Sequence, residues 1–377
     1  MAGPSTFSTI AKPASDVGVR SFNEWDPLEE VVVGTARGAV RSPYEPACAP
    51  LVAPGDPDRA FSGAPFSEEE IAQAEEQLDG FARLMERRGI VVRRPDPIDH
   101  ATTIVTPDFA IAAGHAQTCP RDVLLVVGDE LIEASMAQRS RSFEWRAYRT
   151  LLKHYFSLGA RWTVAPRACM ADDLYVSDYE TTSAPYDFTG HPNLTEVEPV
   201  FDAACFARCG RDIFWQPDIV SNAFGAAWLQ RHLGSGYRIH QLEFEDPFPE
   251  HIDATFVPLR PGLALVNPDR PAKHDGLKLL RDNGWETIDA QPSVRDVGVW
   301  AWGVSRWISM NILSLDASTV VIEEAEEPFG EMLAAHGFEV LTTPFDAVYR
   351  FGGSFHCCTL DVRRRGDLES YFPTLDR

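Results

Sequence analysis

The stretch Gly352 to Gly366, GGSFHCCTLDVRRRG, contains residue types that a thiol-based enzyme needs. If this stretch is a strand, neighbouring side chains point to opposite faces, so Cys357 shares a face with Phe355 and His356 with Cys358. An adjacent histidine is then a poor base for Cys357, and adjacent cysteines form a disulfide only under strain. Taken alone, the stretch predicts a buried apolar strand; a nucleophilic cysteine and a metal or disulfide site are the alternatives.

A cysteine nucleophile needs a base or cation that keeps it as a thiolate, and the base must itself be oriented. His251, in DPFPEHIDATF, is the best distant candidate, because it lies at the expected start of a strand with Asp253 on its own face. The alternative is a surface histidine at the end of a loop. His240 and His232 fit less well, since they fall in an apparent strand and at an apparent helix end.

Three carboxylates lie at the mouths of apolar strands, namely Asp122, Asp202 and Asp253. An unpaired carboxylate is costly in such surroundings. The plainer explanations are an ion pair between Asp122 and Arg121 and helix capping by Asp202. Together with a cysteine and a histidine, however, three acids fit a site for a guanidinium group, whose planar donors match carboxylates.

The composition narrows the class of protein. The chain has 377 residues and a formal net charge of −22, which disfavours partners such as nucleic acid and anionic membranes. An acidic surface explains this charge, and a cationic small substrate is compatible with it. Seven cysteines without a secretory signal predict reduced thiols in the cytoplasm. No stretch approaches the roughly 20 apolar residues of a membrane helix, and no nucleotide-binding glycine motif occurs.

The chain is predicted to have a flexible tail over residues 1–20 and a single domain over residues 21–377. Five blocks of that domain read strand, strand, helix, strand. Helices are expected near residues 67–89, 143–158, 220–233, 273–283 and 328–336, the first with a capping box of Ser67 and Glu70. Hairpin turns are expected at Gly128-Asp129 and Pro261-Gly262. The repeated pattern favours a ring of modules over a doubly wound sheet.

Several long segments, in this order, resemble the arginine:amine amidinotransferase family: FNEWDPLEEVVVGTA, PRDVLLVVGDELIEASMAQRSR, EPVFDAACFARCGRDIF, HIDATFVPLRPGLALVNPDRP and GGSFHCCTLDVRRRG. That family includes glycine amidinotransferase of creatine biosynthesis, the inosamine enzyme of streptomycin biosynthesis and relatives in cyanotoxin pathways. The resemblance runs from about residue 22 to 372. It implies the α/β pentein fold, in which five ββαβ modules form a pseudo-fivefold propeller around a central site, and it implies a homodimer.

The resemblance also implies roles for individual residues. Cys357, directly after FH, matches the family's nucleophile, and His251 of HIDATF matches its general acid and base. Asp202 of FDAA matches the acid that orients this histidine. Asp122 of PRD and Asp253 of HID match the acids that bind the guanidinium group.

Two further residues and several departures complete the comparison of motifs. Arg270 of NPDRP resembles the arginine that clamps the donor's carboxylate, and Ser305 of SRWISMN resembles a residue at the donor's α-carbon. Creatine-pathway members have FDAAD where this chain has Cys205, and a third glycine where it has Ser354. Val304 stands where those members have a serine.

The loop before the histidine departs most. Glycine-using members have Asn-Pro-Met-His there, whereas this chain has Phe248, Pro249, Glu250 and His251. Phe248 adds apolar bulk, and Glu250 adds a negative charge that repels a carboxylate and attracts a second cation. These changes favour a larger amine of specialised metabolism, such as saxitoxin-type biosynthesis, as acceptor. The alternative is glycine, which would make the chain a glycine amidinotransferase that produces guanidinoacetate.

The predicted function is transfer of the amidino group of L-arginine, through a covalent intermediate on Cys357, to an acceptor amine with release of L-ornithine. The predicted partners are these small molecules, and neither a metal nor a cofactor is expected. A deiminase-like hydrolase of the same fold and a binding protein with a structural thiol are the other hypotheses.

Overall fold

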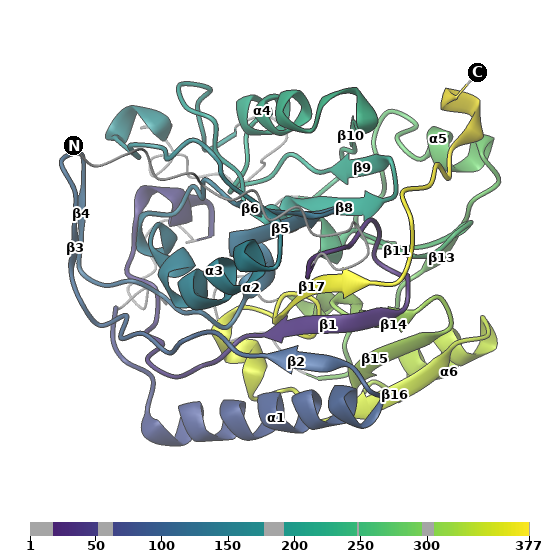
Figure 1. Cartoon of the computed structure of the whole chain (residues 1–377), viewed down its shortest axis with the longest axis horizontal. Helices are drawn as coiled ribbons and strands as arrows, with labels where there is room; N and C mark the ends of the chain where they lie inside the picture. Colours follow the sequence, from purple (N-terminus) through teal and green to yellow (C-terminus); the bar gives the residue numbers. More distant parts are fainter. Residues whose placement is uncertain (1–17, 52–62, 177–191, 247–248, 296–304, 377) are drawn as a thin grey trace, which may run out of the picture.

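The structure, a computed structural model, describes residues 18–51, 63–176, 192–246, 249–295 and 305–376. Within them the chain forms five three-stranded sheets and one two-stranded sheet (Figure 1). The strands are β1 Leu28–Val33, β2 Val91–Arg93, β3 Ile104–Val105, β4 Ala110–Ile111, β5 Leu124–Val127, β6 Glu130–Glu133, β7 Arg161–Val164, β8 Phe206–Cys209, β9 Asp212–Trp215, β10 Arg238–Gln241, β11 Phe256–Arg260, β12 Leu263–Val266, β13 Glu286–Asp289, β14 Leu313–Asp316, β15 Thr319–Glu323, β16 Glu339–Thr343 and β17 Thr359–Arg364.

Each three-stranded sheet has the same pattern. Its central strand pairs antiparallel with one neighbour and parallel with the other. The sheets are β17-β1-β2, β5-β6-β7, β8-β9-β10, β11-β12-β13 and β14-β15-β16. The mixed α/β fold and the repeated blocks expected from the sequence are therefore confirmed.

The helices that connect these strands vary in length. The α-helices are α1 Glu68–Arg87, α2 Pro120–Val123, α3 Arg149–Ser157, α4 Ala223–Leu233, α5 Lys278–Asp282 and α6 Glu327–Ala335. The 3₁₀ turns are η2 Pro46–Leu51, η3 Arg139–Arg141, η4 Glu144–Tyr148, η5 Asp172–Leu174, η7 Ala203–Cys205, η8 Gly234–Gly236, η9 Ile252–Ala254, η10 Arg306–Met310, η11 Val348–Phe351 and η12 Pro373–Leu375. The helix expected near residues 143–158 is thus divided into η4 and α3, and the one near 273–283 is shortened to α5.

The best-predicted helix is α1. Its capping box is present, because Ser67 Oγ accepts from the backbone N–H of Glu70 and Glu70 accepts from that of Ser67. Leu78, Phe81 and Met85 are fully buried on one face. In Figure 1, α1 lies along one side of the molecule and α4 along the opposite side, with the sheets between them.

The first sheet joins the two ends of the described chain. Its strand β17 pairs antiparallel with β1, and Val33 lies opposite Thr359 in this pair. Figure 1 shows the two strands, one from each end of the colour range, side by side. The first of the five blocks read from the sequence began with β1 and did not include β17. Nothing local in either segment specifies a pairing across more than 300 residues.

Both predicted hairpins are confirmed. Gly128 lies between β5 and β6 with φ 63°, and Gly262 lies between β11 and β12 with φ 83°. These left-handed values favour glycine, since other residues are strained there. The four residues before β17 do not form the predicted strand. Residues 355–358 form turns, so the strand predicted for FHCC begins only at Thr359.

The end of the predicted tail is packed against the domain. Residues 1–17 lie outside the described residues, but Val19 is fully buried and the backbone N–H of Arg20 donates to the carbonyl of Val362. In the described part of the chain, no helix has the length and apolar character required to cross a membrane.

Candidate active site

Five turns bring polar residues together at one place in the fold. Each turn lies just before the first strand of a three-stranded sheet. Four of them contain a residue predicted from the sequence, and the fifth contains Asn311. These residues are Asp122 before β5, Asp202 before β8, Asp253 before β11, Asn311 before β14 and Cys357 before β17. All except Asp202 line one cavity, and Asp202 is fully buried behind it. Residues from sheets far apart in sequence thus meet in one place.

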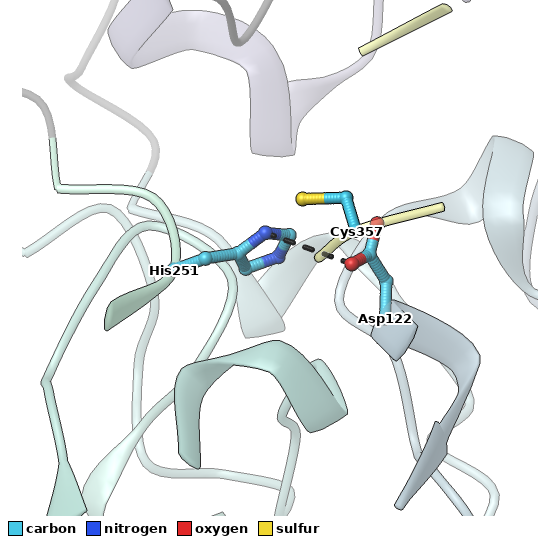
Figure 2. A group of neighbouring side chains, drawn as sticks. All are labelled: Asp122, His251 and Cys357. Carbon is cyan, nitrogen blue, oxygen red and sulfur yellow. Dashed lines mark ion pairs between the residues drawn. The ribbon is translucent and has the colours of Figure 1, made fainter. Parts of the chain in front are cut away.

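Cys357, His251 and Asp122 form the centre of this cavity. Their reactive atoms, one from each side chain, all lie within 4.8 Å of one another. Figure 2 shows the thiol, the imidazole and the carboxylate facing one another from three segments. A thiol, an imidazole and a carboxylate at this spacing suit covalent catalysis, and they are also ligand types that Zn²⁺ accepts.

His251 lies between two carboxylates. Its Nδ1 is 3.7 Å from Oδ1 of Asp122, and its Nε2 is 3.2 Å from Oδ2 of Asp202. Burial alone would lower the pKa of His251, but the two carboxylates outweigh it and raise this pKa well above the usual range. The raised pKa lets His251 keep its proton to higher pH than an ordinary histidine, which suits a group that acts as an acid.

The backbone of His251 is held in an unusual conformation. Its φ of 61° and ψ of 147° lie where a residue with a Cβ is strained, at a cost of about 1–3 kcal/mol. Its backbone N–H donates to Oδ2 of buried Asp218 at 2.9 Å, which helps to hold this geometry. The strand expected at His251 begins only at Phe256, after η9.

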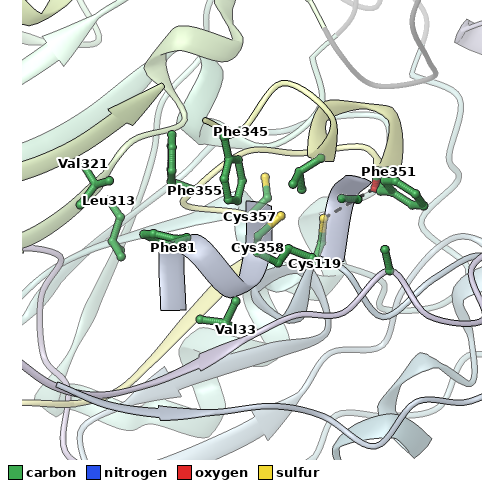
Figure 3. Close-up of a cluster of buried hydrophobic side chains, with 14 of the residues drawn as sticks. Val33, Phe81, Cys119, Leu313, Val321, Phe345, Phe351, Phe355, Cys357 and Cys358 are labelled. Carbon is green, nitrogen blue, oxygen red and sulfur yellow. Dashed lines mark hydrogen bonds between the residues drawn. The ribbon is translucent and has the colours of Figure 1, made fainter. Parts of the chain in front are cut away.

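The surroundings of Cys357 favour the thiol over the thiolate. Contact with the thiol of Cys119, then burial and the charge of Asp253, raise the pKa of Cys357 well above its usual value, against the opposing effect of His251. Cys358 is fully buried, and it lies among the apolar side chains in Figure 3. Its expected role in packing agrees with this position.

His356 points toward Asp253. Its Nδ1 is 2.7 Å from Oδ2 of Asp253, and its Nε2 is 3.6 Å from Oε2 of Glu24. The argument that strand alternation separates His356 from Cys357 is wrong, since both residues lie in a turn and both side chains approach Asp253. Burial would raise the pKa of Asp253, but the hydrogen bond and charge of His356 lower it below the usual value.

Arg141 is a buried cation that the sequence did not single out. It lies 3.0 Å from Asp122, 2.9 Å from Glu144 and 3.4 Å from Asp202. Burial nevertheless raises the pKa of Asp122, against the charges of His251 and Arg141. Arg141 is the last residue of the motif that begins at PRD, which is one of the segments that resemble the family. Its place in that motif was the one signal from which the sequence could have indicated a role for Arg141.

The simpler explanations for two of the acids are wrong. Arg121 does not pair with Asp122; it lies 3.4 Å from Glu24 and 2.5 Å from Asp361. Asp202 precedes η7 but makes no side-chain capping bond. Both acids instead face the buried Arg141 and His251.

Asn311 is the second residue that the sequence did not single out. Its Nδ2 donates to Asp253 at 2.7 Å and lies 3.1 Å from the sulfur of Cys357. Its Oδ1 accepts from the backbone N–H groups of Cys357 and Ser354. These bonds fold residues 354–357 into a turn where the sequence predicts a strand.

The remaining predicted residues differ in position. Ser305 and Glu250 line the cavity. Arg270 is not among its lining residues, and its Nη1 lies 2.9 Å from Asp246. Phe248 lies outside the described residues. Burial raises the pKa of Glu250 to about 7, and its Oε2 has no hydrogen-bond partner among the described residues.

Comparison with known proteins decides the family. No protein-family model matches the chain. The chain is 44% identical over 356 residues to L-arginine:L-lysine amidinotransferase of Pseudomonas savastanoi pv. phaseolicola, which covers 94% of this chain and 96% of that protein. The chain belongs to the arginine:amine amidinotransferase family. This amidinotransferase is also 42% identical over 360 residues to mitochondrial glycine amidinotransferase of Gallus gallus, with 94% of this chain and 85% of that protein covered.

Two solved amidinotransferases have the same fold. SxtG, an amidinotransferase of the saxitoxin biosynthetic pathway from Microseira wollei, is 42% identical with a TM-score of 0.84, covering 94% of this chain and all of that one. Inosamine-phosphate amidinotransferase StrB1 of Streptomyces griseus is 38% identical with a TM-score of 0.84, covering 94% and 99%. The resemblance read from the sequence motifs is therefore confirmed, and so is the class of enzyme, a transferase.

Proposed function

We propose that this amidinotransferase moves the amidino group of L-arginine to an acceptor amine through a covalent intermediate on Cys357. The observation that carries the proposal is the cluster of Cys357, His251 and Asp122, with reactive atoms within 4.8 Å of one another. As the guanidinium group binds, the thiol of Cys357 loses its proton to solvent. The thiolate sulfur then attacks the guanidinium carbon, and the bond from that carbon to Nε of arginine breaks. His251 donates a proton to this nitrogen, and L-ornithine leaves.

The second half of the reaction reverses these roles. An acceptor amine attacks the amidino carbon, His251 takes its proton, and the carbon–sulfur bond breaks to restore the thiolate. Asp202, 3.2 Å from His251, would hold the imidazole in place throughout. Because ornithine leaves before the acceptor reacts, we expect ping-pong kinetics.

The guanidinium group would activate the thiol that attacks it. Asp122 and Asp253 are proposed to bind this cation, and the charge of Asp253 is one of the causes that raise the pKa of Cys357. A bound cation compensates that charge and therefore lowers the pKa of the thiol. Oδ2 of Asp253 already accepts from Asn311 and His356, which leaves Oδ1 for the substrate.

The other ends of arginine need binding groups as well. Ser305, which lines the cavity, is proposed to contact the substituents at the α-carbon. Arg270 is proposed to bind the α-carboxylate, for which it would exchange its ion pair with Asp246. We further propose that the five sheets form a pseudo-fivefold propeller of the pentein type and that the enzyme is a cytoplasmic homodimer.

The covalent intermediate gives a direct test of the transfer. Wild-type enzyme mixed with arginine and no acceptor should release one equivalent of ornithine in a burst and carry an amidino group on Cys357, read by mass spectrometry of its peptide. Absence of the adduct after rapid acid quenching would contradict covalent transfer. Continuous formation of citrulline without an amine would instead identify a hydrolase.

The acceptor is proposed to be a larger amine with a second cation, in a specialised-metabolite pathway such as that of a saxitoxin-type toxin. Glu250 supports this proposal, because it lines the cavity and its Oε2 has no hydrogen-bond partner among the described residues. Two relatives named above, an L-arginine:L-lysine enzyme and a saxitoxin-pathway enzyme, agree with such an acceptor. The alternative is glycine, which the relative in Gallus gallus uses by its name.

Replacing Glu250 by methionine should raise turnover with glycine relative to L-lysine by about tenfold, since one ion pair of modest strength is lost. The pKa of Glu250 is raised to about 7, so this carboxyl group becomes charged as the pH rises from 6 to 8. The preference of the wild type for lysine should therefore increase over that range, whereas that of Glu250→Met should not. Mass spectrometry of guanidino products measures both ratios.

A matched control is Glu245→Met, which removes the same charge from an exposed residue five positions away. It should leave the ratio and its pH dependence unchanged. Equal turnover of glycine and lysine by the wild type at every pH would refute the role of Glu250.

A further inference from the structure

The amide of Asn311 uses its full hydrogen-bonding capacity at the nucleophile. Nδ2 donates one hydrogen to Asp253 at 2.7 Å and the other toward the sulfur of Cys357 at 3.1 Å. Oδ1 accepts from the backbone N–H groups of Cys357 at 3.0 Å and Ser354 at 3.1 Å. A side-chain amide has two donor hydrogens and two acceptor lone pairs. Because all four are used, the orientation of this amide is fixed and Nδ2, not Oδ1, faces the sulfur.

The place of Asn311 in the fold matches that of the residues already assigned to the reaction. Asp122, Asn311 and Cys357 each stand two positions before the first strand of a sheet, and Asp253 stands three before. Asp202 stands four before the first strand of its own sheet. Each of the five three-stranded sheets thus contributes one such residue, and Asn311 is the contribution of β14-β15-β16.

We propose that Asn311 is a catalytic residue whose Nδ2–H group donates to the sulfur of Cys357 and stabilises its thiolate. This inference rests on the proposed role of Cys357 as nucleophile. Hydrogen bonds to a charged acceptor are roughly twice as strong as those between neutral groups, so this bond strengthens as the thiol loses its proton. It therefore favours the reactive form and holds the sulfur on the side of Asp253.

A neutral donor suits this position for an electrostatic reason. A lysine or arginine beside the sulfur would stabilise the thiolate more strongly, but it would repel the guanidinium group that Asp122 and Asp253 are proposed to bind. An amide supplies a donor without a charge. Because the same Nδ2 also binds Asp253, it fixes the separation between the sulfur and one of the carboxylates that would hold the reacting carbon.

The test is the pH dependence of alkylation of Cys357 by iodoacetamide, without substrate. Peptide mass spectrometry follows Cys357 separately, and exposed Cys169 in the same sample is the internal reference. Asn311→Ala removes the donor, and Asn311→Asp removes it while keeping an acceptor for the two backbone N–H groups. Both variants should move the alkylation midpoint of Cys357 upward by about 1–2 pH units, the effect of one hydrogen bond to a charged group.

Controls separate this role from a structural one. Ser309→Ala removes a buried hydroxyl from the same segment, one that donates to Gln291 and does not line the cavity, and it should leave the midpoint unchanged. Thermal unfolding of each variant shows that the protein tested is folded. A structural role of Asn311 would lower stability without moving the midpoint.

Two results would overturn the inference. One is a midpoint within about 0.3 pH unit of the wild type in both variants, well below the shift that one such bond should cause. The other is a shift in Asn311→Asp but none in folded Asn311→Ala, which would assign the effect to the added charge. Neither result requires amidino transfer, so the inference can fail while trapping of the Cys357 adduct still supports the proposed function. Failure to trap that adduct, conversely, leaves the alkylation result interpretable.

Discussion

Replacing Cys357 by alanine should lower the release of ornithine from arginine by at least about 10⁴-fold, the order of loss found when a covalent nucleophile is removed. The reason is chemical: alanine has no electron pair that can attack the guanidinium carbon, and none of the acids around it can substitute for the thiol. Binding of arginine should survive, because Asp122 and Asp253, which are proposed to bind the cation, are unchanged. Ornithine assay under saturating arginine and isothermal titration with arginine measure the two quantities separately.

The adjacent thiol provides the matched control for this variant. Cys358 is fully buried among apolar side chains, so Cys358→Ala removes one sulfur from the neighbouring position and should keep turnover within a few-fold of the wild type. A Cys357→Ala protein that still produced ornithine at a measurable fraction of the wild-type rate would require a different nucleophile. A loss in Cys358→Ala as large as in Cys357→Ala, with both proteins folded, would mean that this segment fails for structural reasons.

Replacing Arg141 by methionine should lower the free energy of unfolding by about 3–5 kcal/mol, the usual effect of leaving buried charges without their partner. Arg141 lies within 3.4 Å of three buried carboxylates, those of Asp122, Glu144 and Asp202. Methionine fills a similar space but gives them no cation. The folded fraction of the variant should also lose activity, because two of those acids flank His251. Urea unfolding and ornithine assay measure these effects.

The loss of stability in Arg141→Met should depend on pH in one direction. Burial already raises the pKa of Asp122, and it raises that of Glu144 to about 7. Loss of the cation should raise both pKa values further above those of the unfolded chain, so the penalty of these buried charges is relieved where the groups are protonated. The deficit of Arg141→Met should therefore shrink as the pH falls from 8 to 5. Arg281→Met is the control, since this arginine is 54% exposed, its partner Asp275 is 57% exposed, and such an ion pair is worth about 1 kcal/mol or less. A deficit no larger than that of the control would refute the buried role of Arg141.

Local signals made most of the architecture predictable. The capping box of Ser67 and Glu70 and the apolar spacing along α1 lie within one segment, and so do the glycines of the two hairpins. Such features act over a few residues and therefore appear in the sequence itself. The pairing of β1 with β17 depends on two segments more than 300 residues apart, and neither contains a local signal for it.

The contrast between local and long-range signals also explains why the strand predicted around Cys357, the proposed nucleophile, was wrong. Phe355, His356 and Cys357 have side chains that are common in strands, but the backbone there bonds to Asn311, 46 residues before Cys357. The groups proposed to react were chosen by their residue types and by the family motifs in which they stand. Asn311 and Arg141 were missed because they hold other groups in place, although the position of Asn311 before β14 repeats that of Asp122 before β5.

The pairing of β17 with β1 also has a consequence for when the proposed nucleophile reaches its place during folding. Cys357 stands two residues before β17, so its position depends on a strand pair formed by the most widely separated segments of the domain. Contacts of such long range form slowly, since the entropy of closing a long loop must be lost before the contacts can compensate for it. We therefore expect a nascent or partly folded chain to contain assembled acids before it contains a placed thiol, so that activity appears only in the last step of folding.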